Sequence, residues 1–380
     1  MEGSRFPPYP ILMKELLVAL ALFSPVVHPD RTVTFNLTAP GAAKVALNCE
    51  SLGSHEMAKG DGGVWTYTSP ALAPDVYSYS FTLDGTKVVD PSNLDLKTGY
   101  FGNESMVLVP GGGAAAPWEP RDVPHGVIHR HPYRSQIAKH DRECWVYTPP
   151  GYDPKSAKPL PVLYLLHGFS DGVDGWTSAG RAHVILDNLL ADNKIVPMVV
   201  VMPLGYGDMS VLSNGWNGRQ KDNAWEKSLA GFDLALMREV LPLAEANYRV
   251  RSDAAGRAVA GLSMGGCESI QSALLHPDTF GWVGAFSSGG LPADLDAAFP
   301  AAKDSLNSQF KLLWIACGKQ DGLLKANQNL VAWLDQKGIK HAWTETEGAH
   351  AWGVWRRNLA AFTPLLFRDS GGIAAPGLRR

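Results

Sequence analysis

The sequence predicts two domains in succession, a small all-β sandwich followed by a larger α/β domain. Short runs with alternating apolar residues crowd residues 31–85, whereas longer apolar runs, typical of buried parallel strands, alternate with helical segments after residue 118. Residues 109–117 separate the two regions and contain only Val, Pro, Gly and Ala. A chain of 380 residues is also long for one hydrophobic core and ample for two.

The front domain is predicted at residues 28–109. Alternation of apolar and polar residues is typical of a strand with one buried face. The pair Asp84-Gly85 supplies a hairpin turn after the last alternating run. Several short strands at close spacing predict a small immunoglobulin-like sandwich. The strands are expected at residues 32–37, 44–47, 64–68 and 77–81.

The linker is predicted at residues 110–117, the α/β domain at 118–368 and a C-terminal tail at 369–380. A Gly-rich and Ala-rich composition does not by itself make the linker flexible. Trp118 and the Pro-containing stretch after it are expected to pin the linker to the second domain. No internal repeat at solenoid or propeller spacing is present in the sequence.

A candidate leader occupies residues 1–27. Residues 16–23 are apolar, Lys14 precedes them, and Ala19-Leu20-Ala21 has the small-x-small form of a signal-peptidase site. The apolar run is too short to span a bilayer, so no membrane partner is expected. The segment favours a secreted or periplasmic protein over a cytoplasmic one. The cysteines at 49, 144, 267 and 317 are scattered and indicate no disulfide framework.

Composition and charge exclude several classes of function. The chain has 34 basic and 37 acidic residues and a net charge of -3, which argues against a nucleic-acid partner. No metal or other cofactor is predicted, because the sequence has neither an H-E-x-x-H motif nor a Walker loop. His125, His129 and His131 lie in an extended stretch bracketed by prolines, without clear acidic or Cys ligands beside them.

The most informative motif is Gly261-Leu262-Ser263-Met264-Gly265. It follows an apolar run at residues 258–260 and precedes a helix-forming segment at 267–275 that Pro277 ends. A serine on a sharp strand-to-helix turn is strained, and any side chain at the glycine positions would clash. The pattern therefore predicts the nucleophile elbow of an α/β-hydrolase catalytic domain, with Ser263 as the nucleophile.

A serine nucleophile requires a histidine base and a carboxylate that orients it, and in this fold they follow in the order Ser, Asp or Glu, His. Asp321 comes after a predicted buried strand at residues 312–316. A helix at 325–337 and a strand at 340–346 follow, and His350 falls in the next loop. The sequence thus predicts Asp321 as the acid and His350 as the base. His167, His183 and His276 are predicted to be structural.

The negative charge that develops on the attacked carbonyl oxygen needs fixed hydrogen-bond donors. The backbone amide of Met264 is one predicted donor, because the elbow aims it at the site. The second is predicted in the loop of residues 167–171, at the amide of Phe169. Asp171 and Asp174 in the same Gly-rich stretch are expected to stabilise turns.

These pieces together resemble the esterase D-like superfamily and, within it, the feruloyl and acetyl xylan esterases of carbohydrate esterase family 1. In that family the catalytic residues map by motif onto Ser263, Asp321 and His350. One departure is His183, where the family often has a small polar residue. The resemblance covers nearly all of residues 120–368, at 147–152, 164–171, 180–190, 232–250, 257–266 and 348–356.

The front domain resembles the family 48 carbohydrate-binding modules and related early-set immunoglobulin-like domains, which occur ahead of feruloyl esterase domains. The matching sequence segments are residues 63–66, 76–81, 83–85 and 90–93. Sugar binding requires exposed aromatic rings, and Trp65, Tyr77 and Tyr79 fit either a binding platform or the core.

The resemblance implies a serine carboxylic ester hydrolase acting on plant cell-wall carbohydrate esters. A feruloyl esterase that releases ferulate from arabinoxylan is favoured over an acetyl xylan esterase, with feruloylated or acetylated xylan or oligosaccharide as substrate. The alternatives are a siderophore (enterochelin-type) esterase, a catalytically inactive glycan-binding protein and an acyltransferase. Trp176, Trp216 and Trp225 are candidates to line the acyl or sugar pocket, and each fits the core equally well. The oligomeric state is left open.

Overall fold

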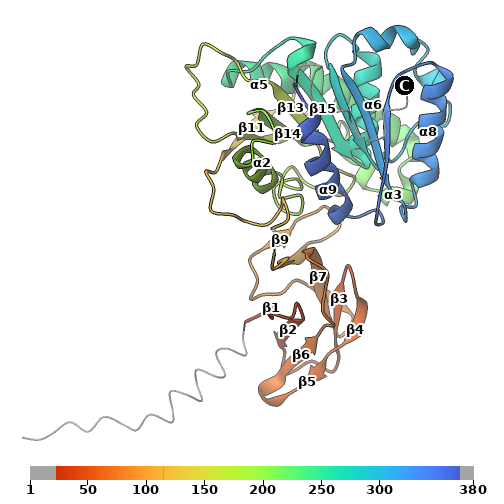
Figure 1. Ribbon diagram of the computed structural model, residues 1–380. Coiled ribbons are helices and arrows are strands. Elements are labelled where there is room, and N and C mark those ends of the chain that lie inside the picture. Colours follow the sequence, from red (N-terminus) through yellow and green to blue (C-terminus); the bar gives the residue numbers. More distant parts are fainter. Residues whose placement is uncertain (1–22, 114, 369–380) are drawn as a thin grey trace, which may run out of the picture. The chain divides into compact units, whose positions relative to one another are not determined.

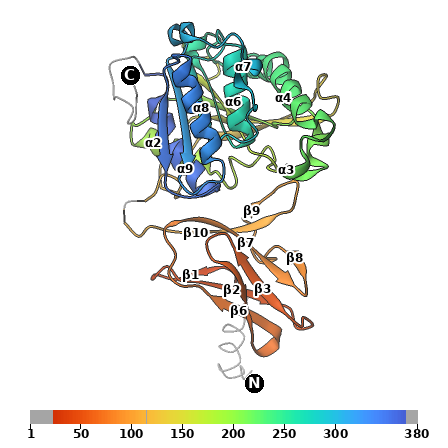
Figure 2. The ribbon, with the colours of Figure 1, turned by 90° about the vertical axis from the view of Figure 1, so that its right-hand side faces the viewer.

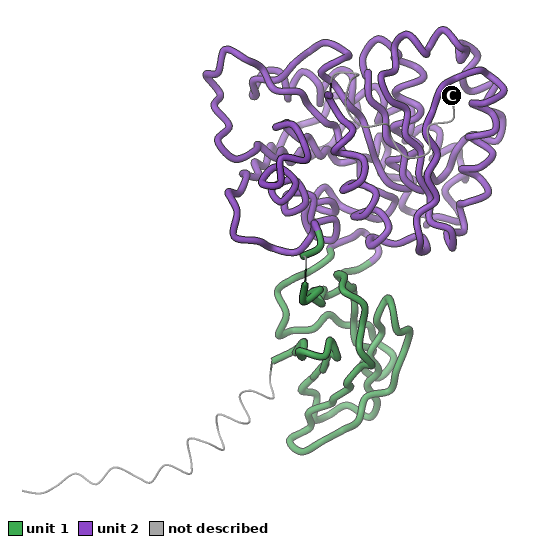
Figure 3. Tube along the Cα trace, viewed as in Figure 1, with its two compact units in different colours: residues 1–97, 102–116 green, residues 98–101, 117–380 purple. Residues whose placement is uncertain are grey.

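The computed structural model describes residues 23–113 and 115–368. The chain folds into two compact units (Figure 3). Unit 1 contains the described residues up to Lys97 together with Gly102–Ala116, and unit 2 contains Thr98–Phe101 and the chain from Pro117 onward. Most of the predicted leader and the whole predicted tail lie outside the described residues, so both stay predictions. No helix within the described ranges is long and apolar enough to cross a membrane.

Unit 1 is built from two β-sheets (Figure 1). Strands were expected at residues 32–37, 44–47, 64–68 and 77–81, and the structure confirms all four, extending the last to 75–83. The first sheet has the order β1-β2-β6-β5, and the second the order β4-β3-β7-β10-β9 with β8 paired to β7. The strands are β1 Val26–Val27, β2 Val33–Thr38, β3 Val45–Cys49, β4 Gly53–Glu56, β5 Ala58–Lys59, β6 Val64–Thr68, β7 Asp75–Leu83, β8 Thr86–Val88, β9 Leu96–Lys97 and β10 Glu104–Val109.

The core of unit 1 lies between its two sheets. Every second residue of β2 is buried, as the alternating sequence predicted, and Phe35 of β2 meets Tyr79 of β7 edge-on with ring centroids 4.8 Å apart. Trp65 is buried too, and its indole N–H donates to the carbonyl of Ala39 at 3.0 Å. The rings of Trp65 and Tyr79 are therefore core residues and not a sugar-binding platform. Glycan binding by this unit stays a prediction.

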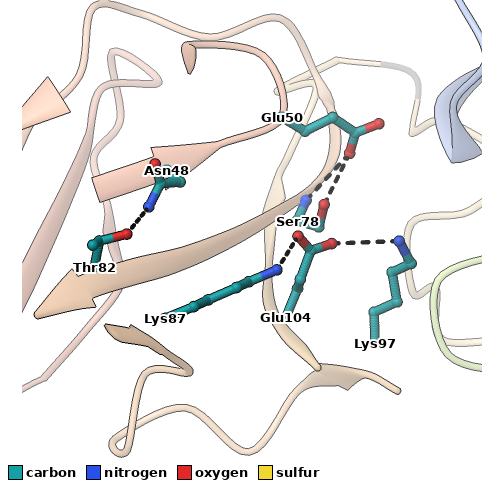
Figure 4. A network of polar contacts seen from close by, with 7 residues as sticks. All are labelled: Asn48, Glu50, Ser78, Thr82, Lys87, Lys97 and Glu104. Carbon is teal, nitrogen blue, oxygen red and sulfur yellow. Dashed lines mark hydrogen bonds and ion pairs between the residues drawn. The ribbon is translucent and has the colours of Figure 1, made fainter. Parts of the chain in front are cut away.

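Polar side chains link the strands of the larger sheet of unit 1 (Figure 4). Glu104 on β10 accepts from Lys87 of β8 at 3.0 Å and from Lys97 of β9 at 3.3 Å. Glu50, just after β3, accepts from the amide and the hydroxyl of Ser78 on β7, each at 3.3 Å. Exposed ion pairs of this kind contribute little stability each, so the apolar core remains the main reason that the sheets hold together.

Unit 2 contains one eight-stranded sheet of order β11-β12-β14-β13-β15-β16-β17-β18 (Figure 1). The strands from β14 to β18 are parallel, while β11 and β12 add an antiparallel edge. Apart from the edge strand β18, the parallel strands are buried, mainly apolar runs, as expected for a sheet covered on both faces. Their bounds are β11 Val127–Arg134, β12 Asp141–Thr148, β13 Val162–Leu166, β14 Val199–Pro203, β15 Arg257–Leu262, β16 Trp282–Phe286, β17 Leu312–Gly318 and β18 Ala342–Thr346.

Helices cover both faces of this sheet (Figure 2). Ile270 of α6 and Leu330 of α8 share a cluster with Val283 and Ile315 on one face, whereas Phe362 of α9 packs on Phe286 and Trp314 of the other. A π-helical turn at Leu236–Val240 joins α4 to α5. The helices are α2 Ala182–Ala191, α3 Gly215–Gly218, α4 Ala224–Ala235, α5 Leu241–Asn247, α6 Met264–Leu275, α7 Leu295–Ala298, α8 Leu324–Gln336 and α9 Trp352–Phe362, with short 3-10 turns at Asp61–Gly63, Met209–Leu212, Lys221–Asn223, Ala254–Gly256, Asp304–Ser308 and Thr363–Leu365.

The chain that enters unit 2 is fixed at its first residues. Trp118 is buried, with the guanidinium of Arg356 5.9 Å from its ring centre. The side-chain amide of Asn188 donates to the carbonyls of Pro117 and Glu119, both at 2.8 Å. The expectation that Trp118 anchors the end of the linker is confirmed. The grouping of Thr98–Phe101 with unit 2 differs from the predicted domain of residues 28–109.

Candidate active site

Ser263 lies on the sharp turn between β15 and α6. Its backbone φ is 51° and ψ is -114°, a conformation rare for a residue with a side chain. A Cβ on Gly261 would lie 2.5 Å from the backbone of Gly265, and a Cβ on Gly265 would lie 2.6 Å from the carbonyl oxygen of His167. The glycines two residues before and after the serine are thus required sterically, as the motif predicted.

Three side chains that are far apart in the sequence meet at this turn. Nε2 of His350 lies 3.0 Å from Oγ of Ser263, and Nδ1 of His350 lies 2.8 Å from Oδ2 of Asp321. Asp321 follows β17, and His350 follows the neighbouring strand β18. Because parallel strands end at the same edge of the sheet, the loops after β15, β17 and β18 converge there. The distances fit a nucleophile, a base and an orienting acid.

The environment of Asp321 keeps its carboxylate charged. Burial alone would raise the pKa of Asp321, but hydrogen bonds from His350 and from the Leu323 amide, the latter at 2.8 Å, outweigh it and hold the pKa below its ordinary value. A carboxylate in this position accepts from Nδ1–H of His350 and leaves Nε2 free to accept a proton. The ring of Trp355 contacts His350 edge-on at 4.8 Å and restricts its rotation.

Two backbone amides point to an oxyanion site. Ser263 is the residue before α6, so the Met264 amide is one of the helix N-terminal donors without an intrahelical partner. Among the described residues neither the Met264 amide nor the Phe169 amide donates to another protein atom. The loop that carries Phe169 is closed by Asp171, which accepts from the Gly168 amide at 3.2 Å. The assignment of both amides to an oxyanion remains a proposal.

His167 is a structural residue beneath the elbow, as predicted. Its Nε2 accepts from the Gly205 amide at 2.8 Å, so its Nδ1–H donates to the carbonyl of Gly168, also at 2.8 Å. Burial of the ring lowers the pKa of His167 to about 4. The imidazole is therefore neutral at neutral pH, and it joins the oxyanion loop to the segment after β14.

A stability measurement can test this role of His167. The unfolded chain binds a proton at this residue near the ordinary pKa of 6.5, whereas the folded chain does so only near pH 4, so acidification between these values favours unfolding. We expect this residue to remove about 2 kcal/mol of unfolding free energy between about pH 7 and about pH 5. The unfolding free energy of His167→Gln, measured by urea denaturation, should not show this loss on acidification.

The comparison with His167→Gln is needed because a second buried group changes the unfolding free energy with pH in the opposite direction. Burial raises the pKa of Glu268 well above its ordinary value, so its contribution to stability falls as the pH rises. Wild type and His167→Gln share Glu268, and the difference between their pH dependences isolates the histidine. Identical pH dependences for the two proteins would contradict the neutral, doubly hydrogen-bonded state of His167.

The three candidate pocket tryptophans differ in their positions. Trp176 is 1% exposed and donates to the carbonyl of Leu166, and Trp225 is 2% exposed and donates to the carbonyl of Gly290. Both belong to the core, which is one of the two positions that the sequence left open for them. Trp216 lies beside the nucleophile. A Cβ placed on Gly289 would be 3.2 Å from Cη2 of Trp216 and 3.1 Å from Oγ of Ser263.

The other histidines that the sequence analysis considered lie outside the site. His125 bonds to Asp187, His129 to Thr148 and His131 to Tyr248, at 3.0, 3.0 and 2.5 Å. His183 lies in α2, where burial lowers its pKa, and His276 at the end of α6 bonds to Asp233 at 2.8 Å. In the part of the chain that the structure describes, no group of three or more His, Cys, Asp or Glu residues could hold a metal ion.

Sequence reasoning missed two features near the elbow. Glu268 of α6 is buried, and in the described residues neither of its carboxyl oxygens has a hydrogen-bond partner. A charged residue within the helix-forming segment 267–275 was the available signal. Arg219 places its guanidinium 3.9 Å from the ring centre of Trp216, a contact that the sequence spacing alone cannot reveal.

The chain is similar to known esterases. A family model described as putative esterase matches residues 135–366. The endo-1,4-beta-xylanase/feruloyl esterase of Xylanibacter ruminicola is 31% identical over 355 residues, which are 90% of this chain and 46% of that protein. The chain thus spans less than half the length of this relative.

Two solved structures share the fold. The CE1 ferulic acid esterase of Anaeromyces mucronatus in complex with ferulic acid has a TM-score of 0.58 at 23% identity, covering 66% of this chain and 93% of its own. The enterobactin esterase of Shigella flexneri has a TM-score of 0.64 at 19% identity, covering 88% of this chain and 92% of its own.

Proposed function

The chain belongs to the putative esterase family, and from this premise we propose that it is a serine carboxylesterase of the CE1 type that acts on plant cell-wall carbohydrate esters. The observation that carries the proposal is the single imidazole of His350, within hydrogen-bond reach of both Ser263 and Asp321 at 3.0 and 2.8 Å. That arrangement suits acyl transfer through a covalent intermediate.

The proposed reaction has two halves. Nε2 of His350 accepts the Ser263 hydroxyl proton as Oγ bonds to the ester carbonyl carbon, and the Met264 and Phe169 amides donate to the oxyanion. The bond to the leaving alcohol then breaks, and His350 gives its proton to that oxygen. Water repeats the sequence on the acyl-enzyme, releases the acid and restores Ser263.

Within this class we propose a feruloyl ester of arabinoxylan as the substrate, in preference to an acetyl ester. Support comes from the relative with feruloyl esterase in its name and from the aromatic surroundings of the nucleophile. Phe169 and Trp216 contact each other with centroids 5.3 Å apart, and such rings suit a planar aromatic acyl group. A polymeric cell-wall substrate also fits the export expected from the leader, and we propose a secreted or periplasmic protein.

A siderophore esterase is the second candidate. The observation in its favour is the extent of the match to the enterobactin esterase, which covers 88% of this chain and therefore reaches into both units. That enterobactin esterase was solved in the presence of 2,3-dihydroxy-N-benzoyl-glycine, which contains an aromatic benzoyl group, so aromatic residues around Ser263 do not separate the two candidates.

Product analysis separates the candidates. Wild-type protein is incubated in parallel with feruloylated arabinoxylan, acetylated xylan and enterobactin, and the released acids are identified by chromatography. We expect ferulate release at a rate at least about tenfold above acetate release, because a pocket built for a large apolar group discriminates by roughly this factor. Preferential cleavage of enterobactin would establish the siderophore esterase instead. No release from any of the three would contradict the substrate class.

A further inference from the structure

A short segment between strands of unit 1 belongs structurally to unit 2. Residues Thr98–Phe101 lie between β9 and β10 in the sequence, yet they are part of unit 2 (Figure 3). The Tyr100 amide donates to the carbonyl of Ser170 at 2.8 Å, and Oγ1 of Thr98 donates to Asp174 at 2.7 Å. Gly99 forms an isolated β-bridge with Asp171. The segment is thus fastened to the loop that carries Phe169.

The aromatic rings form a row that begins at the nucleophile. Trp216 lies beside Ser263, Phe169 contacts Trp216 with centroids 5.3 Å apart, and Phe101 contacts Phe169 with centroids 5.7 Å apart. We call Trp216, Phe169 and Phe101 the aromatic row. Its first two members are half-buried, whereas Phe101 is 57% exposed. The row therefore leads from the reacting hydroxyl to the surface of unit 2.

Phe101 is exposed next to a second exposed aromatic residue, Tyr100. An apolar ring left in water contributes less to stability than a buried one, and a fixed exposed ring beside a site is typical of a binding surface. The side-chain hydrogen bond of Thr98 and the backbone contacts of Gly99 and Tyr100 hold the segment in place, so Phe101 is presented without a large loss of entropy on binding. Tyr100, 46% exposed, is braced edge-on against Tyr206 at 5.5 Å.

We propose that Phe101 is the platform for the sugar of the leaving alcohol, an inference that rests on the proposed function. The acyl carbon must sit at Ser263, where Trp216 and Phe169 enclose it, whereas a sugar still attached to a polymer must extend toward solvent. Phe101 is the member of the row at the exposed end. The C–H face of a sugar ring is apolar and packs against an aromatic ring, which requires no charged partner.

The experiment compares esters that share an acyl group and differ in the alcohol. Methyl ferulate is paired with a feruloylated arabinoxylo-oligosaccharide, and p-nitrophenyl acetate with an acetylated xylo-oligosaccharide. For Phe101→Ala we expect KM for the sugar esters to rise about five- to tenfold, with kcat for all four substrates within about twofold of wild type. Phe101→Leu, which keeps the apolar volume without the ring, should behave like Phe101→Ala, and Phe101→Tyr should restore the wild-type KM.

Leu94→Ala is the matched control. Leu94 is also an exposed apolar residue, at 94%, and it precedes the segment Thr98–Phe101 in the sequence but belongs to unit 1. We expect this variant to leave every KM unchanged. Equal increases in KM for methyl and sugar esters in Phe101→Ala would show that the ring binds the acyl group, and this result would overturn the platform. If the wild-type protein hydrolyses the two small esters but neither sugar ester, both the proposed substrate class and the sugar platform are wrong. If only the platform is wrong, the wild-type protein still hydrolyses the sugar esters.

Discussion

Replacement of Ser263 by alanine is expected to lower kcat for a p-nitrophenyl ester by on the order of 10⁴- to 10⁶-fold. The variant has no oxygen to form the acyl-enzyme, while the amides of Phe169 and Met264 and the aromatic row remain. KM should therefore change little, and the residual rate should reflect attack by water. The measurement is steady-state hydrolysis at saturating ester, combined with mass spectrometry to detect an acyl adduct in wild type and its absence in the variant.

Ser269→Ala is the control for this variant. Ser269 lies on the same helix, α6, and its buried hydroxyl donates to the carbonyl of Gly265 at 2.7 Å. It has no contact with His350 or Asp321 among the described residues. We expect its kcat to stay within a few-fold of wild type. A Ser263→Ala protein with the activity of Ser269→Ala would overturn the serine mechanism.

Replacement of Asp321 by asparagine is expected to lower kcat by on the order of 10⁴-fold at neutral pH while KM stays near the wild-type value. The carboxylate accepts from Nδ1–H of His350 at 2.8 Å and stabilises the imidazolium that forms during the reaction. The amide side chain of asparagine can donate to Nδ1 of His350 instead. This favours the tautomer that carries its proton on Nε2, and a protonated Nε2 cannot accept the proton of Ser263. Steady-state kinetics and thermal unfolding of the same preparations give the comparison.

Asp233→Asn provides the matched control, because Asp233 also bonds to a histidine, His276, at 2.8 Å, on a different part of unit 2. Both variants replace the carboxylate of an Asp–His hydrogen bond by an amide, so a general effect on folding should appear in both. Only Asp321→Asn is expected to lose activity. A loss below about tenfold in Asp321→Asn, or an equal loss in the control, would contradict the role of Asp321 as the orienting acid.

The positions of Ser263 and Asp321 could be predicted because each follows a strand with a strong local signal, whereas His350 follows the weaker edge strand and was predicted from the order of the three residues. The runs at residues 258–260 and 312–316 are apolar on both faces, as parallel strands of a covered sheet must be. The order of the three residues then leaves few choices, since the carboxyl ends of such strands share one edge. The observed strands β15 and β17 extend these runs by only a few residues.

The aromatic surroundings of the site could not be predicted in the same way. Trp176 lies in a turn and Trp216 in the short helix α3, both within segments rich in glycine and polar residues, yet Trp176 is buried and Trp216 lies beside Ser263. Loop conformation decides this difference, and local sequence carries little of it. The same holds for Thr98–Phe101, whose partners at residues 168–174 are distant in the sequence, and for Glu268, whose burial depends on helix packing.

The four cysteines of the chain are all unpaired and buried, in both units. Desolvation raises the pKa of the thiols at positions 49, 144, 267 and 317, so little thiolate is present at neutral pH. Alkylating agents can therefore reach these sulfurs only when a unit opens. The rate of thiol alkylation therefore reports how often each unit unfolds. Modification of Cys49 indicates opening of unit 1, and modification of the other three cysteines indicates opening of unit 2, which carries the triad.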